Sequence, residues 1–275
     1  MTGASQLVAE LVSSGLPARE ARWLVEEFAP GAHPDAAVIL RAAARRRLDG
    51  EPLQYIIGHW PFRSLDLDVD ERVLIPRPET EGLVEVALSE LAASGAEAPL
   101  IVDLGCGSGA IGLSLLVELR ARGVVASLIA LDASLDALAL ARQNARKHDV
   151  LNVTFVHSSW YERLEPTLAG HVELIVANPP YVSATEFKGL DPVLRHEPRS
   201  AIVARDTPDA AGFADLAHII AGASHWLSAS GVLVCEHANL QRDAALHAAR
   251  EAGFARVEDL EDLSGHPRVL VARRS

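Results

Sequence analysis

Residues 100–112 read LIVDLGCGSGAIG, a short apolar run that leads into three closely spaced glycines. Apolar residues at helical spacing follow as far as Leu119, so the pattern predicts a strand, a loop and a helix in that order. Gly105, Gly107 and Gly109 allow the backbone to turn tightly and to approach a ligand closely. Such a loop lies at the carboxyl end of a parallel strand, where small ligands bind. We therefore expect a nucleoside-like ligand at this loop.

The charge near this loop distinguishes between two cofactors. Residues 107–112 match the G-x-G-x-x-G pattern, so an NAD-dependent oxidoreductase is one alternative. Asp103 precedes the first glycine, and its carboxylate would repel a pyrophosphate but attract the cationic amino group of S-adenosylmethionine. A second predicted strand, 126–131, ends at Asp132, which can accept hydrogen bonds from ribose hydroxyls in either cofactor. The sequence therefore favours S-adenosylmethionine.

A second motif, Asn178-Pro179-Pro180-Tyr181, follows the apolar run 172–177. Its two prolines fix φ and carry no N–H, so the loop offers carbonyl acceptors without competing donors. Asn178 adds a side-chain carbonyl, and the Tyr181 ring offers a flat face suited to a planar NH2-bearing group. The motif predicts a pocket for an amide or an exocyclic amine, whereas an ordinary turn after a strand is the alternative.

Together these motifs resemble those of the HemK/PrmC family, the protein-(glutamine-N5) methyltransferases that modify peptide chain release factors. The resemblance extends over Glu51-Pro52 with Tyr55 and Gly58, residues 74–81 (LIPRPETE), residues 103–112, Asp132, Asn144, Asn178-Pro179-Pro180-Tyr181, His196-Glu197-Pro198 and Glu236-His237. It departs after Glu236-His237, where the family usually has glycine and this chain has Ala238-Asn239. The resemblance implies methyl transfer from S-adenosylmethionine to a glutamine side-chain amide of class I release factors.

The resemblance also implies roles for individual residues. Contact with S-adenosylmethionine is implied for Gly105, Cys106, Gly107, Ser108, Gly109, Asp132 and Trp160, with Asn178 beside them. The substrate glutamine would be held by Asn178, Pro179, Pro180 and Tyr181. Trp160 is expected near the adenine, and a core or rim aromatic is the alternative. The roles of Arg77, Thr80, His196 and Glu197 stay open, with a structural salt bridge as one reading of His196 and Glu197.

The expected mechanism depends on positioning. An amide nitrogen is a poor nucleophile because its lone pair is delocalised into the carbonyl. Our hypothesis is that the Asn178 side-chain oxygen and the Pro179 carbonyl accept the two amide hydrogens and turn the lone pair toward the sulfonium methyl group. Orientation of this kind can supply as much as ~7–11 kcal/mol. Asn178 and Pro179 are therefore the predicted catalytic residues.

The main alternative is a nucleic-acid amino-methyltransferase acting on adenine N6 or guanine N2, because a flipped base presents a similar planar amine. A formal net charge of −12 is unlike the basic footprint that phosphate binding requires. We therefore expect a protein substrate and no stable nucleic-acid binding. We also expect a cytoplasmic protein, since no charged segment followed by an apolar stretch marks a signal peptide. A monomer is expected as well, although no pattern in the sequence indicates the oligomeric state.

The apolar pattern divides the chain into a helical domain at 1–50, a β-hairpin linker at 51–78 and a larger domain at 79–275. The resemblance implies substrate recognition by the first of these and methyl transfer by the last. The fold class is α/β, with a doubly wound, Rossmann-like sheet of the methyltransferase type. Helical periodicity appears around Leu7–Leu11, Ala21–Phe28 and Val38–Ala43, with breaks at Pro17, Pro30-Gly31, Pro34-Asp35 and Gly50. Residues 62–75 alternate as a strand pair, with Asp66, Asp68 and Asp70 on the solvated face and Leu65, Leu67 and Val69 opposite.

Neither a membrane span nor a metal site is expected. Residues 216–235 lack Asp, Glu, Lys and Arg, but the cluster 228–231 (SASG) predicts a turn between a helix and a buried strand, 232–235. Cys106 and Cys235 are the chain's two cysteines, too few for a disulfide framework or a cysteine-rich metal site. The 11 histidines show no H-E-x-x-H or comparable spacing.

Overall fold

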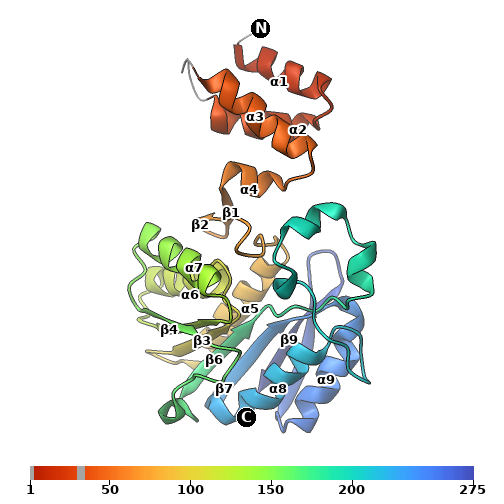
Figure 1. The fold of residues 1–275 in the computed structure, drawn as a ribbon. Coiled ribbons are helices and arrows are strands. Elements are labelled where there is room, and N and C mark those ends of the chain that lie inside the picture. The colour runs from red at the N-terminus through yellow and green to blue at the C-terminus, as the bar shows by residue number, and fades with distance from the viewer. Residues whose placement is uncertain (1–2, 30–34) are drawn as a thin grey trace.

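A helical region and a hairpin precede the large sheet in the computed structural model, which describes residues 3–29 and 35–275 (Figure 1). These elements are α1 (Gly3–Ser13), α2 (Ala18–Phe28), α3 (Ala36–Leu48), α4 (Leu53–Ile57), β1 (His59–Phe62) and β2 (Leu65–Asp68). The helices share one apolar cluster, which includes Leu24 of α2, Leu40 of α3 and Leu53 of α4. The breaks expected at Pro30-Gly31 and Pro34 lie outside the described residues. The division at residue 50 stays a prediction, although α4 belongs to the same cluster.

One apolar face was predicted wrongly. Val38 and Ile39 were expected on the buried side of α3, but they are 66% and 46% exposed. The face that packs on the other helices contains Leu40, Ala43 and Ala44. These residues recur at the 3–4 spacing of one helical face. Val38 lies on the opposite side of the helix, and Ile39, although four residues before Ala43, lies at the edge of the packed face.

The hairpin is shorter than predicted and begins earlier, because β1 and β2 pair antiparallel from His59 opposite Asp68 to Phe62 opposite Leu65. Its inward face is as expected, since Leu65, Leu67 and Val69 are buried. Residues 69–79 contain no further strand and form a linker to α5 with turns at 71–72 and 78–79. Prolines at 76 and 78 lack the N–H that a strand pair needs, which explains why alternation alone overestimated the hairpin.

The central sheet has the strand order β5-β4-β3-β6-β7-β9-β8 among the described residues. Its elements are α5 (Thr80–Ser94), β3 (Leu100–Leu104), α6 (Ala110–Ala121), β4 (Ser127–Asp132), α7 (Leu135–Lys147), β5 (Val153–His157), β6 (Val172–Ala177), α8 (Ala214–Trp226), β7 (Leu227–Glu236), α9 (Arg242–Glu251), β8 (Arg256–Glu261) and β9 (Pro267–Arg273). Short 3₁₀ turns occupy Pro166–Leu168, Glu186–Gly189, Pro192–His196, Arg199–Ala201 and Asn239–Gln241. The first five strands of this order are parallel, and β9 runs antiparallel to both β7 and β8.

Helices accompany the strands of the sheet (Figure 1), and the buried residues form two apolar clusters, one on each face of the sheet. This arrangement confirms the predicted doubly wound architecture. Neighbouring residues of one strand enter opposite layers: Ile101 packs with α5, α6 and α7, whereas Val102 packs with α8 and α9. From β3 the chain moves to β4 and β5 on one side and returns to β6 on the other. The loops after β3 and β6 therefore diverge at a topological switch point, where ligands bind in open α/β sheets.

The turn predicted at residues 228–231 is wrong. Strand β7 runs through this segment, and its pairing with β6 shifts between Val172 opposite Leu227 and Leu174 opposite Val232. A Cβ atom at Gly231 would lie 2.7 Å from the backbone oxygen of Val172. Glycine here allows a bulge with close backbone approach. Among the described residues, no helix has the length and apolar character needed to cross a membrane.

Candidate active site

A cavity of about 480 Å³ lies at the switch point between β3 and β6. The glycine loop, the end of β4 and Trp160 line it, and so do Asn178 and Pro180 after β6. Another wall is formed by Pro198, Ser200 and Ala201 together with the linker residues Arg72, Val73, Leu74, Pro76 and Arg77. The two sequence motifs, which are about seventy residues apart in the chain, therefore open into one pocket of the size that cofactors occupy.

The glycine loop has a left-handed backbone at Gly105, Gly107 and Gly109, with φ values of 74°, 53° and 85°. The backbone N–H groups of Gly105 and Cys106 both donate to the Leu131 carbonyl, at 2.8 and 2.9 Å. A Cβ atom at Gly105 would lie 3.4 Å from the Trp160 ring. Glycine therefore serves two purposes here, because it permits the backbone conformation and leaves room for the indole against the loop.

Asp132 fastens the loop to the neighbouring strand. Its Oδ2 accepts a hydrogen bond from the Gly107 N–H at 2.9 Å, and its Oδ1 accepts one from the Ser134 N–H at 2.8 Å. Burial raises the pKa of the Asp132 carboxyl, and these backbone hydrogen bonds oppose the rise. Asp132 lines the cavity, so its remaining lone pairs are available to accept from hydroxyl groups.

Asp103 occupies a different position, fully buried beneath the loop and outside the cavity lining. Its Oδ2 accepts from the Gly112 N–H at 3.0 Å, and its Oδ1 has no hydrogen-bond partner among the described residues. Burial raises the pKa of Asp103 to about 7, and the charge of Asp132 adds to the rise. A buried carboxylate with a free oxygen fits a cationic group, so the predicted contact with the amino group of S-adenosylmethionine remains our proposal.

Asn178 is the polar residue at the other end of the cavity. Its Nδ2 lies 3.1 Å from the Thr80 hydroxyl, and that hydroxyl lies 2.7 Å from Oε2 of Glu236. The Tyr181 hydroxyl is 3.4 Å from Oε1 of the same carboxyl group. The side chains of Thr80 and Glu236 are buried, with 4% and 1% exposure. Asn178 is thus held by a buried polar chain that the sequence analysis did not connect.

The linker wall is tied to the opposite wall by a buried carboxylate. Glu197 accepts from Arg77 Nη2 at 2.5 Å and from the Ile75 N–H at 2.9 Å, and its side chain is 2% exposed. This supports the salt-bridge reading of Glu197, whereas His196 is exposed to solvent. Arg77 lines the cavity, so the ion pair joins two of its walls.

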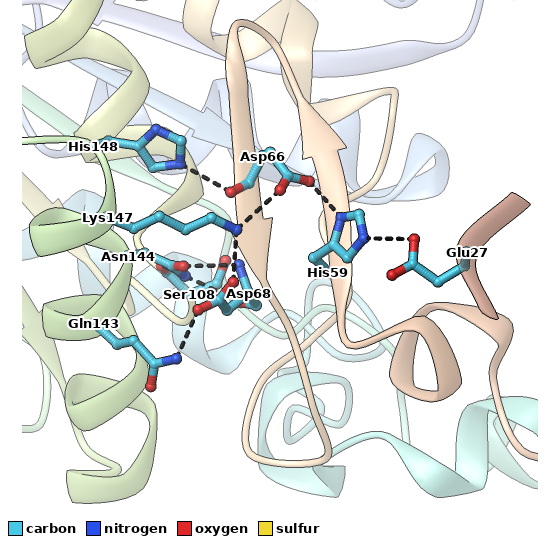
Figure 2. A network of polar contacts seen from close by, with 9 residues as sticks. All are labelled: Glu27, His59, Asp66, Asp68, Ser108, Gln143, Asn144, Lys147 and His148. Atoms are coloured by element: carbon cyan, nitrogen blue, oxygen red, sulfur yellow. Dashed lines mark hydrogen bonds and ion pairs between the residues drawn. The ribbon is translucent and has the colours of Figure 1, made fainter. Parts of the chain in front are cut away.

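A polar network connects the helical region with the glycine loop (Figure 2). His59 on β1 bridges Glu27 on α2, at 3.2 Å, and Asp66 on β2, at 2.6 Å. Lys147 at the end of α7 donates to Asp66 and Asp68 at 2.9 and 2.7 Å. Two of the three aspartates on the predicted solvated face, Asp66 and Asp68, are therefore held by Lys147 of a neighbouring element.

Asn144 is the innermost member of this network and is fully buried (Figure 2). Its Nδ2 donates to the Ser108 carbonyl at 2.9 Å and to the Asp68 carbonyl at 3.1 Å. Its Oδ1 accepts from the Asp68 N–H at 2.8 Å. One side chain thus joins the hairpin to the loop that lines the cavity.

Replacing Asn144 by leucine should destabilise the protein and weaken cofactor binding. The substitution leaves backbone groups of Asp68 and Ser108 without partners, at about 1–3 kcal/mol for each buried group. Urea unfolding and calorimetric titration with S-adenosylmethionine measure the two effects. Gln143→Ala is the matched control, because Gln143 bonds to the exposed carboxylate of Asp68. Equal stability and affinity in Asn144→Leu and Gln143→Ala would show that Asn144 does not hold the hairpin to the glycine loop.

Most predicted site residues line the cavity: Gly105, Cys106, Gly107, Ser108, Asp132, Trp160, Asn178 and Pro180. Asp103, Gly109, Pro179 and Tyr181 lie outside its lining. Sequence reasoning missed Ser134, Ser158, Ser200 and Asp215, which line the cavity from loops and a helix end. Ser134 had a usable signal, since it follows the strand that ends at Asp132, but the others belong to no motif.

These features fit S-adenosylmethionine in three ways. The cavity has an acceptor for ribose hydroxyls at Asp132 and an aromatic face at Trp160. Beneath the glycine loop, outside the cavity lining, the buried Asp103 has a carboxylate oxygen without a partner among the described residues. No group of three or more His, Cys, Asp or Glu side chains in 3–29 and 35–275 is arranged to hold a metal ion. A doubly wound sheet whose glycine loop and Asn-Pro-Pro-Tyr loop share one pocket defines an S-adenosylmethionine-dependent methyltransferase.

Comparison with known proteins identifies the family. Residues 84–190 match the model of the methyltransferase small domain. A release factor glutamine methyltransferase of Haemophilus influenzae is 41% identical over 239 residues, which cover 84% of this chain and 79% of the relative. One of Coxiella burnetii is 40% identical over 235 residues, covering 86% and 79%. The chain belongs to the release factor glutamine methyltransferase family, which confirms the resemblance read from its motifs.

Solved structures share the fold at low sequence identity. The hMettl16 catalytic domain in complex with MAT2A 3'UTR hairpin 6 has a TM-score of 0.57 and 16% identity, covering 97% of this chain and 91% of that one. A T. Thermophilus 16S rRNA methyltransferase in complex with AdoMet and guanosine has a TM-score of 0.54 and 17% identity, covering 79% and 50%. These matches support the methyltransferase fold.

Proposed function

We propose that this protein transfers a methyl group from S-adenosylmethionine to the side-chain amide nitrogen N5 of a glutamine in class I peptide chain release factors. The observation that carries the proposal is the placement of Asn178 and Pro180 in the same cavity as the glycine loop and Asp132. Relatives that bear the name release factor glutamine methyltransferase support the same substrate. Family membership favours this reading over the nucleic-acid alternative and over an NAD-dependent oxidoreductase.

When bound, S-adenosylmethionine supplies a methyl group on a positively charged sulfur, which an oriented nucleophile can attack. The protein's part is to present the amide nitrogen edge-on. The Asn178 side-chain oxygen and the Pro179 carbonyl accept its two hydrogens, and neither proline of the loop has an N–H that would compete. These acceptors also stabilise the positive charge that develops on the nitrogen before it loses a proton.

The helical region is the proposed recognition element for the release factor. It is joined through α4 and the hairpin to the linker, and linker residues 72–74, 76 and 77 form one wall of the cavity. A substrate loop that enters the cavity therefore passes close to this part of the chain. The protein is further proposed to act in the cytoplasm as a monomer and to bind no nucleic acid stably.

Labelled S-adenosylmethionine tests the function directly. Incubation with a class I release factor should place one methyl group on a single glutamine, located by mass spectrometry of the digested substrate. A release factor with that glutamine replaced should take up no label. Transfer of label to an added DNA or RNA in place of the release factor would overturn the proposal.

A further inference from the structure

Four polar side chains meet at the carboxyl edge of the sheet, beside the proposed substrate position: those of Thr80, Asn178, Tyr181 and Glu236. Strands β6 and β7 are parallel neighbours with Ala177 opposite Cys235, so the next residues, Asn178 and Glu236, emerge side by side. Thr80, the first residue of α5, lies between their side chains. The sequence separations are large, at 98 residues from Thr80 to Asn178 and 156 from Thr80 to Glu236.

The chemistry of these groups fixes the direction of each hydrogen bond. An ionised carboxylate only accepts, and a threonine hydroxyl has one proton to give. The Thr80 hydroxyl donates to Glu236 Oε2 at 2.7 Å, and this hydrogen bond opposes the rise in the pKa of Glu236 that burial causes. With its one proton given to Glu236, the Thr80 hydroxyl can only accept from Asn178. The Asn178 group 3.1 Å away must therefore be the NH2 group. The opposite end of that amide, the carbonyl oxygen, then faces away from Thr80.

We propose that Thr80 and Glu236 are positioning residues that hold the Asn178 amide in the one orientation able to accept from the substrate. The inference rests on the proposed function, because only an NH2-bearing substrate requires an acceptor at this point. If the amide were turned over, its NH2 group would face the NH2 group of the glutamine, and two donors would oppose each other. The Tyr181 hydroxyl, 3.4 Å from the second carboxylate oxygen, supplies Glu236 with another donor.

Burial explains why this orientation is well defined. Thr80 and Glu236 are 4% and 1% exposed, so water competes little for their hydrogen bonds. A buried donor or acceptor that loses its partner is costly, which ties the rotation of the Thr80 hydroxyl to the presence of the Glu236 carboxylate. Networks of this kind select one arrangement when every member has a partner.

The hydrogen bonds that run from Glu236 through Thr80 to Asn178 are called the relay below. Kinetics of Thr80→Val test this relay in the full-length enzyme with a release factor as substrate. Valine keeps the shape of threonine but can neither accept from Asn178 nor donate to Glu236. We expect kcat to fall about tenfold or more at saturating cofactor, because the amide is no longer held. Thr80→Ser, which keeps the hydroxyl, should recover most of this loss. Cofactor affinity, measured by calorimetry, should change little in either variant.

A double-mutant cycle separates positioning from a general structural role. In an Asn178→Ala background no amide is left to orient, so Thr80→Val should have almost no further effect on kcat. An equal fold-loss in both backgrounds would overturn the relay. Glu236→Met removes the acceptor and should reproduce the Thr80→Val loss in kcat. Glu236→Gln keeps an oxygen for Thr80 and should lose less. Equal losses in the two Glu236 variants would also count against it.

A measurement without substrate keeps the inference independent of the proposed function. In isotope-labelled protein with bound cofactor, the side-chain NH2 signal of Asn178 is assigned by its loss in Asn178→Ala. Its hydrogens should exchange slowly with solvent in the wild type and in Thr80→Ser, and faster in Thr80→Val. Unchanged exchange in Thr80→Val would refute the relay, even for an enzyme that methylates no release factor. If the proposed function is wrong, the wild-type enzyme itself will transfer no methyl group to a release factor.

Discussion

Asn178→Ala should lower kcat about 10²-fold or more, the scale found when one preorganised polar group is lost from a site. The variant removes the side-chain oxygen that accepts an amide hydrogen, so the nitrogen lone pair is no longer aimed. Positioning carries this reaction because a neutral amide nitrogen needs no strong base before it attacks, only the correct orientation. Affinity for S-adenosylmethionine should change much less, because Asp132 and the glycine loop stay intact.

Single-turnover methylation at saturating cofactor and release factor is the decisive measurement. It excludes product release and weak substrate binding as causes of a lower rate. Asn239→Ala, at an exposed asparagine outside the cavity, is the matched control and should behave as the wild type. Near-normal single-turnover rates in Asn178→Ala would show that the asparagine is not the acceptor.

Local sequence was sufficient to predict several strands of the sheet and the residues on the cofactor side of the site. The run 100–112 specifies its own strand, loop and helix, because positive-φ glycines and apolar periodicity are properties of neighbouring residues. Strands 127–132 and 172–177 were expected within a residue or two for the same reason. Asp132 could be placed since it ends a strand next to that loop in a parallel sheet.

Contacts between distant segments were beyond sequence reasoning. Thr80, Asn178 and Glu236 each belong to a family motif, but nothing local indicates that they share hydrogen bonds. The same holds for Asn144, whose partners lie 36 and 76 residues away. Val38 and Ile39 were misplaced because an apolar pair does not determine which helical face a neighbouring helix will cover. Tertiary packing decided each of these outcomes.

Asp103→Asn should stabilise the cofactor-free protein, and increasingly so as the pH rises. The wild-type carboxyl is fully buried, with its pKa raised to about 7 by that burial. In the unfolded chain the same group titrates near its ordinary value of about 3.9. Between these values the folded state binds more protons than the unfolded state, so its stability falls as pH rises. Asparagine can accept from Gly112 in the same way and never ionises.

The difference in unfolding free energy between Asp103→Asn and wild type should be small near pH 4 and grow to at most about 4 kcal/mol near pH 7, at about 1.4 kcal/mol per unit of pKa. Urea unfolding across this range measures it. Asp209→Asn, at an exposed aspartate, controls for the change in net charge. A difference that does not vary with pH would mean that Asp103 ionises as easily in the folded protein as in the unfolded chain.

Asp103→Asn should stabilise the cofactor-free protein but weaken its binding of S-adenosylmethionine. A cationic amino group near the free Oδ1 of Asp103 favours the ionised carboxylate, so wild-type affinity for S-adenosylmethionine should fall as the pH drops below about 7. Asp103→Asn should bind more weakly above that pH and lose this part of the pH dependence. Calorimetry in buffers of different ionisation enthalpy would detect proton release on binding in the wild type. If wild type and variant showed the same pH profile, Asp103 would be a buried support of the Gly112 turn and would not contact the amino group.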